Sequence, residues 1–143
     1  MASLDHIGIA VAELPKLKEL FAILGLEVKN TERVEDQKVD AHFIELPLEQ
    51  GHLEFLSAYD PSSAIAQFIQ KRGPGIHHLS FRVASGELDA LLVKLKAKGY
   101  RLIYETPRMG AHSMRINFIH PSSAGGMLIE VMEPVVTVGE HPV

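Results

Sequence analysis

The sequence of 143 residues contains no cysteine and no tryptophan, and aromatic residues make up only 6% of it. Without cysteine, the protein cannot form disulfides, thiolate zinc sites, iron–sulfur clusters or a cysteine nucleophile. The net charge is −4 and no basic block is present, which argues against nucleic acid as a partner. No apolar run approaches the ~18–20 residues of a membrane span and no signal-peptide pattern is found, so we expect a cytoplasmic protein without a membrane partner.

Histidine is frequent, with eight residues, so any bound metal would have nitrogen and oxygen ligands. The length is that of one compact domain. Within it, an order of strand, helix and three strands occurs twice. The expected elements are residues 6–11, 14–24, 25–28, 39–46 and 53–56, and then 78–83, 88–95, 99–102, 115–119 and 129–132. We predict a single domain over 1–143, with module 1 at about 4–57, a connector at 58–74 with a short helix over 64–71, module 2 at about 75–134 and a tail at 135–143.

Two histidines and two glutamates recur at corresponding places in the two modules. His6 and His78 lie 72 residues apart on the first strands, and Glu54 and Glu130 lie 76 residues apart on the last strands. A carboxylate among packing residues is costly to bury unless it is paired or bound to a cation. If a pseudo-twofold relates the modules, the four side chains converge as two nitrogens and two oxygens, which suit zinc, cobalt, manganese or nickel. The alternative is that the histidines are core or rim residues and the glutamates face solvent.

Several stretches of the chain resemble the vicinal oxygen chelate superfamily and, within it, the methylmalonyl-CoA epimerases. The resemblance covers about residues 4–134 and is carried by 4–11, 75–81, 115–121 and 126–131. It implies the α+β fold class, in which two βαβββ modules in tandem form a cupped, eight-stranded mixed sheet with a metal site in the cleft. The paired histidines at 77 and 78, the Asn-Phe-Ile-His-Pro stretch and the final Leu-Ile-Glu are its more specific parts.

The resemblance also implies a set of site residues. His6, His78 and Glu130 correspond to metal ligands, and Glu54 falls at the fourth ligand position, where epimerases vary between Gln and Glu. Catalysis is expected from Glu130 and Glu54. Some epimerases carry a further glutamate at the position of Ala41, and this chain does not.

The implied activity is the interconversion of the 2R and 2S epimers of methylmalonyl-CoA, in propionate metabolism, by metal-assisted proton abstraction and return through an enolate. The expected partners are the acyl-CoA substrate and a second copy of the chain in a homodimer. A preference between methylmalonyl-CoA and ethylmalonyl-CoA does not follow from the sequence. The candidates for binding the coenzyme A phosphates are Lys71, Arg72, Arg82, Arg108 and Arg115.

The other histidines receive separate interpretations. His77 should point away from His78, as a packing residue or a contact behind the ligands, because neighbours on a strand face opposite sides. His112 and His120 could bind substrate oxygens or cap a loop. His52 and His141 are interpreted as surface residues.

Three other classes remain as alternatives. A glyoxalase-like isomerase of a glutathione adduct uses a similar ligand set. An extradiol dioxygenase uses two histidines and one glutamate on iron, but such enzymes are usually longer. A metal-free binding protein of the bleomycin-resistance type relies on aromatic stacking, for which this chain has few residues.

Overall fold

The computed structural model describes residues 1–136, and the chain divides into two compact units. The first unit is Leu4–Ser80, and the second comprises Met1–Ser3 and the chain from Phe81 onward. The α+β class, the tandem βαβββ modules and the eight strands of a mixed sheet are confirmed. The boundary between the two units differs from the boundary between the two sequence modules, because most of the strand that opens module 2 belongs to the first unit. Among residues 1–136, no helix has the length and apolar character needed to cross a membrane.

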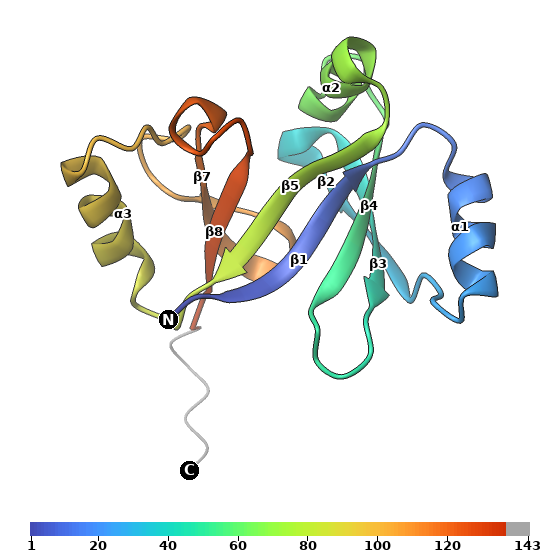
Figure 1. Ribbon diagram of the computed structural model, residues 1–143, viewed down its shortest axis with the longest axis horizontal. Helices are drawn as coiled ribbons and strands as arrows, with labels where there is room; N and C mark the ends of the chain where they lie inside the picture. Colours follow the sequence, from blue (N-terminus) through green and yellow to red (C-terminus); the bar gives the residue numbers. More distant parts are fainter. Residues whose placement is uncertain (137–143) are drawn as a thin grey trace. The chain divides into compact units, whose positions relative to one another are not determined.

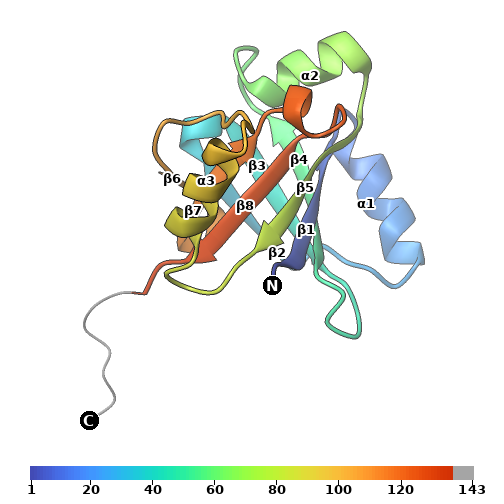
Figure 2. The same cartoon turned by 60° about the vertical axis from the view of Figure 1, so that its left-hand side comes forward.

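The first unit has the strand order β2-β3-β4-β1-β5, with β1 between β4 and β5 (Figure 1, Figure 2). Its elements are β1 (Ser3–Ala10), α1 (Leu14–Ile23), β2 (Asn30–Val34), β3 (Val39–Glu45), β4 (His52–Ala58), α2 (Ala64–Arg72) and β5 (Gly75–Arg82). The β1–β4 pair is parallel, while β2–β3 and β3–β4 are antiparallel. Helix α1 packs on one face through Leu14, Leu17 and Phe21, which contact the core of Val11, Ile44, Leu53 and Phe55. The alternate residues of these strands occupy the opposite face.

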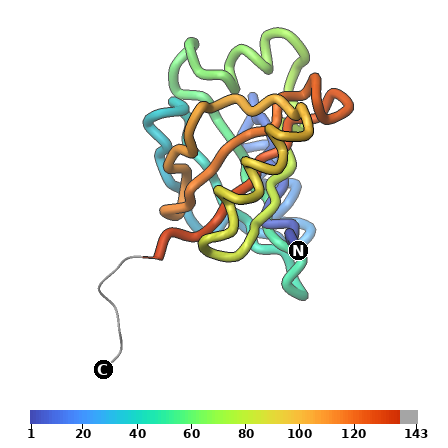
Figure 3. Tube along the Cα trace, turned by 90° about the vertical axis from the view of Figure 1, so that its left-hand side faces the viewer, coloured from blue at the N-terminus to red at the C-terminus, as the bar shows by residue number. Residues whose placement is uncertain are grey.

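The second unit has the strand order β8-β7-β6, with antiparallel pairing. Its elements are α3 (Leu88–Ala97), β6 (Arg108–Met109), β7 (Met114–Ile119) and β8 (Ile129–Pro134). Helix α3 packs against β8 through a core of Val83, Leu88, Leu92 and Val131 (Figure 3). The other face of β7 and β8 carries a second cluster of Met114, Ile116, Phe118 and Met132.

The expected strands at 25–28 and 99–102 are wrong in both modules. Leu26 and Val28 pack against the first core, and the strand that pairs with β3 begins at Asn30. In the second module Leu102 makes one isolated bridge to Ile119, and β6 starts only at Arg108. The apolar side chains in these two stretches pack against the core and do not form a strand ladder. A short apolar run in the sequence does not show which of the two occurs.

Candidate metal centre

Three of the predicted site residues meet within the first unit. His6, Glu54 and His78 are buried, with 4%, 5% and 8% of their surface exposed. His6 Nε2 lies 3.0 Å from His78 Nε2 and also contacts Glu54 Oε2. One donor atom from each residue lies within 4.8 Å of the others, which is a spacing that a single metal ion can bridge. The part of the prediction that brings these three residues together is therefore seen in the structure.

The strand register explains why these side chains meet. In the parallel β1–β4 pair, His6 is opposite His52 and Gly8 is opposite Glu54, so the side chains of His6 and Glu54 emerge from the same face. This face is opposite to the one that α1 covers. The His78 ring from β5 occupies the space beside Gly8, because a Cβ on Gly8 would lie 2.1 Å from His78 Cε1. Gly8 therefore allows the third donor to reach the other two.

The protonation states of the cluster favour metal binding. Burial alone would raise the pKa of Glu54, but hydrogen bonding to His52 and His6 and the nearby imidazoles lower it to about 2. Burial lowers the pKa of His78 to about 3, and His6 and His77 add to this shift. At neutral pH the cluster therefore presents a carboxylate and an uncharged His78 imidazole, which are the forms that bind metals.

The hydrogen bond of Asp5 gives a further test of whether a cation fits. Asp5 Oδ2 lies 2.8 Å from His6 Nδ1, and a carboxylate can only accept, so this nitrogen carries the hydrogen. In the neutral ring, His6 Nε2 then carries a lone pair and no hydrogen. This lone pair points at the carboxylate of Glu54. Two facing lone pairs repel each other unless a proton or a metal ion lies between them. The donor set of two imidazoles and one carboxylate fits a divalent ion of the zinc or cobalt kind.

Glu130 lies in the second unit and matches Glu54 in its local setting. It is 5% exposed and is opposite Phe118 in the β7–β8 ladder, just as Glu54 is opposite Phe43 in the β3–β4 ladder. Both glutamates emerge from the sheet face that the helix of their module does not cover. The structure thus confirms equivalent positions in the two modules, and the role of Glu130 as ligand or base stays a prediction.

The position of Ala41 lies on the same face as Glu54. Ala41 is opposite Leu56, two residues along from the Phe43–Glu54 pair, and is 1% exposed. The neighbouring Asp40 and His42 emerge from the other face. There Asp40 binds the Arg33 guanidinium at 2.8 Å and 3.0 Å, and His42 contacts Thr31 Oγ1 and Ser57 Oγ, each at 2.9 Å. Neither residue supplies the missing carboxylate.

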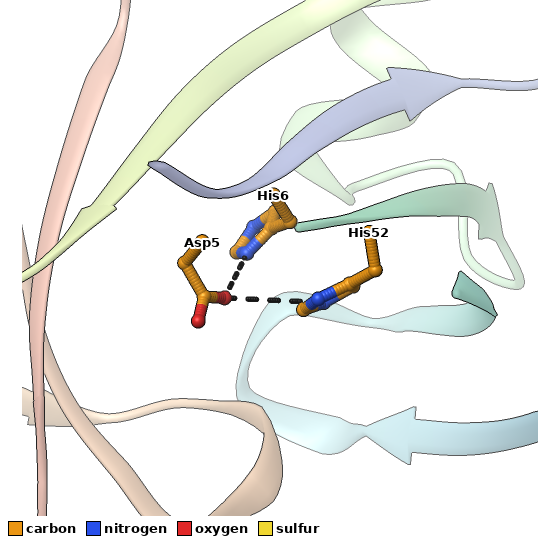
Figure 4. A group of neighbouring side chains, drawn as sticks. All are labelled: Asp5, His6 and His52. Atoms are coloured by element: carbon orange, nitrogen blue, oxygen red, sulfur yellow. Dashed lines mark hydrogen bonds and ion pairs between the residues drawn. The ribbon is translucent and has the colours of Figure 1, made fainter. Parts of the chain in front are cut away.

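The interpretation of His52 as a surface residue is wrong. Its Nε2 lies 3.7 Å from Glu54 Oε2 and 3.9 Å from Asp5 Oδ2, and its side chain is 14% exposed. The ring stacks on His6 with centroids 5.1 Å apart (Figure 4). Its position two residues before Glu54 on the same strand places both side chains on one face, and this spacing was the available sequence signal.

The remaining candidates make contacts of other kinds. Arg115 binds Glu133 at 2.5 Å and Asp89 at 3.0 Å, and these carboxylates raise its pKa. The Arg108 guanidinium lies 4.1 Å from the centre of the Tyr104 ring. His120 Nδ1 accepts a hydrogen bond from the backbone N–H of Ser122, so it caps a loop. His141 lies outside the described residues.

Comparison with known proteins shows the family to which the chain belongs. The family described as the Glyoxalase/Bleomycin resistance protein/Dioxygenase superfamily matches residues 5–118. The chain belongs to this superfamily, which is also called the vicinal oxygen chelate superfamily.

Within the superfamily, several of the similar proteins are named as epimerases of acyl-CoA thioesters. The crystal structure of methylmalonyl-CoA epimerase from Mycobacterium tuberculosis is 41% identical, with a TM-score of 0.87 over 97% of this chain and 92% of that one. A methylmalonyl-CoA epimerase in complex with methylmalonyl-CoA and NH4+ is 33% identical, with a TM-score of 0.83 over 95% of this chain and 96% of that one. An ethylmalonyl-CoA/methylmalonyl-CoA epimerase from Cereibacter sphaeroides is 33% identical over 90% of this chain and 95% of its own length.

Proposed function

We propose that the protein is an isomerase that interconverts the 2R and 2S epimers of methylmalonyl-CoA. The observation that carries this proposal is the buried cluster of His6, Glu54 and His78, on a fold shared with epimerases of this substrate. The buried polar side chains also argue against a metal-free binding protein, because lining a pocket with apolar or aromatic side chains would avoid the free-energy cost of burying polar groups.

The reaction removes the proton that lies between a thioester and a carboxylate and returns a proton to the opposite face. Removal leaves the electron pair on the carbon as an enolate, whose oxygen carries the developing charge. A divalent ion held by His6, His78, Glu54 and Glu130 would supply Lewis-acid stabilisation of that oxygen. The protein must provide the base that takes the proton and the acid that returns one.

We assign the roles of ligand and base to the two glutamates. A carboxylate with a pKa of about 2 takes up protons weakly, since an efficient general base has a pKa near the working pH. Glu54 therefore serves mainly as a ligand, and Glu130 is the stronger candidate for the base. The proton held by Glu130 stays on the face from which it was taken, so in the return step a water on the opposite face gives a proton to the enolate carbon, and the hydroxide that remains takes up the proton of Glu130.

The experiment follows the α proton of methylmalonyl-CoA in D2O by NMR, with the protein loaded with metal and after treatment with a chelator. We expect exchange of deuterium into the α position and loss of that exchange when the metal is removed. A metal-loaded protein that catalyses no exchange would refute the proposed function. Metal analysis of the purified protein identifies the ion among zinc, cobalt, manganese and nickel.

Substrate range and assembly are further parts of the proposal. One extra methylene changes binding in an apolar pocket only modestly, so ethylmalonyl-CoA should also react, as the name of the Cereibacter relative suggests for that protein. The same NMR assay with both substrates tests this. We also propose a cytoplasmic homodimer acting in propionate metabolism, and light scattering measures the oligomeric state.

A further inference from the structure

Each ligand histidine is preceded by a residue whose side chain contacts its second ring nitrogen. Asp5 Oδ2 lies 2.8 Å from Nδ1 of His6, and His77 Nδ1 lies 2.9 Å from Nδ1 of His78. Both pairs are neighbours in the chain, and the pairs are separated by the same 72 residues that separate the ligands. The two modules therefore repeat the neighbour of the ligand as well as the ligand.

Asp5 fixes the proton of His6. Because the carboxylate accepts from Nδ1, the neutral ring carries its one hydrogen there, and Nε2, which is directed toward Glu54, offers its lone pair to a metal ion. The carboxylate of Asp5 is itself largely buried, with 10% of its side chain exposed, and His52 lies 3.9 Å from it (Figure 4). The same His52 ring stacks on His6, so it restricts rotation of the ligand ring.

His77 has the equivalent place behind His78 but a different chemistry. Its ring packs edge-on against Phe68, with centroids 4.9 Å apart and an interplanar angle of 82°. When His78 presents Nε2 to a metal ion, its Nδ1 carries the hydrogen, and Nδ1 of His77 must accept it.

We propose that Asp5 and His77 are positioning residues that hold His6 and His78 with Nε2 toward the metal, and that Asp5 is the stronger of the two. A hydrogen bond to an ionised carboxylate is roughly twice as strong as one between neutral groups. It also makes the ligand nitrogen more basic, which strengthens its bond to the metal. This inference rests on the metal centre of the proposed function and concerns affinity for the ion.

The test is a cobalt titration of the full chain after removal of metal, followed by visible absorption and by competition with a chromophoric chelator. Removing an orienting partner costs about 10–100-fold in metal affinity, so Asp5→Asn should fall in this range. His77→Phe keeps a ring against Phe68 but loses the acceptor, and we expect a loss of about tenfold or less. Both variants should change the cobalt spectrum, because the ligand rings reorient.

Two controls separate positioning from general damage. His42→Gln changes a histidine on the opposite face, between Thr31 and Ser57, and should leave cobalt affinity within about twofold of the parent protein. Asp5→Glu retains a carboxylate and should recover part of the affinity and spectrum lost in Asp5→Asn. If Asp5→Asn fails to fold, Asp5→Glu and His77→Phe decide the question.

The inference is overturned if the folded variants bind cobalt with the affinity and spectrum of the parent chain. In that case deuterium exchange by the parent protein would still support the proposed function. A parent chain that binds no cobalt, nor zinc, manganese or nickel in the same competition, removes both the metal centre and this inference.

Discussion

Glu54 and Glu130 occupy the same position in two copies of one module, and the two units surround them differently. In the first unit the cross-strand neighbour of Glu54 is Phe43, but three imidazoles, including that of His52, lie beside its carboxylate. In the second unit Glu130 emerges beside Phe118, among the apolar side chains of β7 and β8. Duplication thus repeats the position of a carboxylate, and we propose that the residues around it decide whether it acts as a ligand or as a base.

The substitution Glu130→Gln should have the largest effect, which is a loss of catalytic rate. Removal of a general base costs typically about 10²–10⁴-fold in rate, so deuterium exchange into methylmalonyl-CoA should fall by that factor. Cobalt binding should persist through His6, His78 and Glu54. Unchanged exchange would exclude Glu130 as the base and remove the functional difference between the two glutamates.

A second prediction compares a glycine in each unit. In Gly8→Ala the new Cβ would lie 2.1 Å from the buried His78 ring, so we expect a loss of about 1–3 kcal/mol in the free energy of unfolding and weaker cobalt binding. In Gly110→Ala the nearest atom is the Ile116 side chain at 3.1 Å, which can move, so the loss should be below about 1 kcal/mol. Urea denaturation of both variants measures the difference, and equal losses would contradict the close packing of His78 on Gly8.

The third prediction concerns acid stability of the metal-free protein. Burial holds the pKa of His78 at about 3 and that of His77 at about 4, below the ordinary value of 6.5. Between these values and 6.5 the unfolded chain binds protons that the folded chain does not, so stability falls as pH falls. The lowered pKa of Glu54 acts in the same direction between its ordinary value of 4.5 and about 2.

Each such proton contributes on the order of 1.4 kcal/mol per pH unit to the slope. Urea denaturation at pH 7, 6 and 5 should show the decline, and His77→Phe should reduce it. A stability that is flat over this range would contradict the burial of neutral imidazoles.

The smallest effect is expected for Glu54→Gln. Glutamine keeps an oxygen that can bind the ion and loses only the charge, so cobalt affinity and deuterium exchange should fall by about tenfold or less. A loss as large as that of Glu130→Gln would show that both glutamates act as bases.

The sequence predicted the duplicated modules because strand alternation and helical periodicity recur at nearly constant offsets. It also predicted His6, His78 and Glu54, since each breaks an apolar strand at a corresponding place. It did not predict that His52 belongs to the site. The spacing of His52 and Glu54 on one strand was available, but the approach of His52 to Asp5 depends on the register of β1 with β4, which joins residues about 46 positions apart. The strands expected at 25–28 and 99–102 failed for a related reason, because short apolar runs do not show whether they pair or pack.

The most direct test of the account is the dependence of deuterium exchange on bound metal. Chelator-treated protein is titrated with cobalt, and exchange into methylmalonyl-CoA is measured beside the amount of metal bound. We predict that exchange rises in proportion to bound cobalt and saturates at about one ion per chain. Full exchange in the metal-free protein, or none in the loaded protein, would contradict the assignment of His6, Glu54 and His78 to a catalytic metal centre.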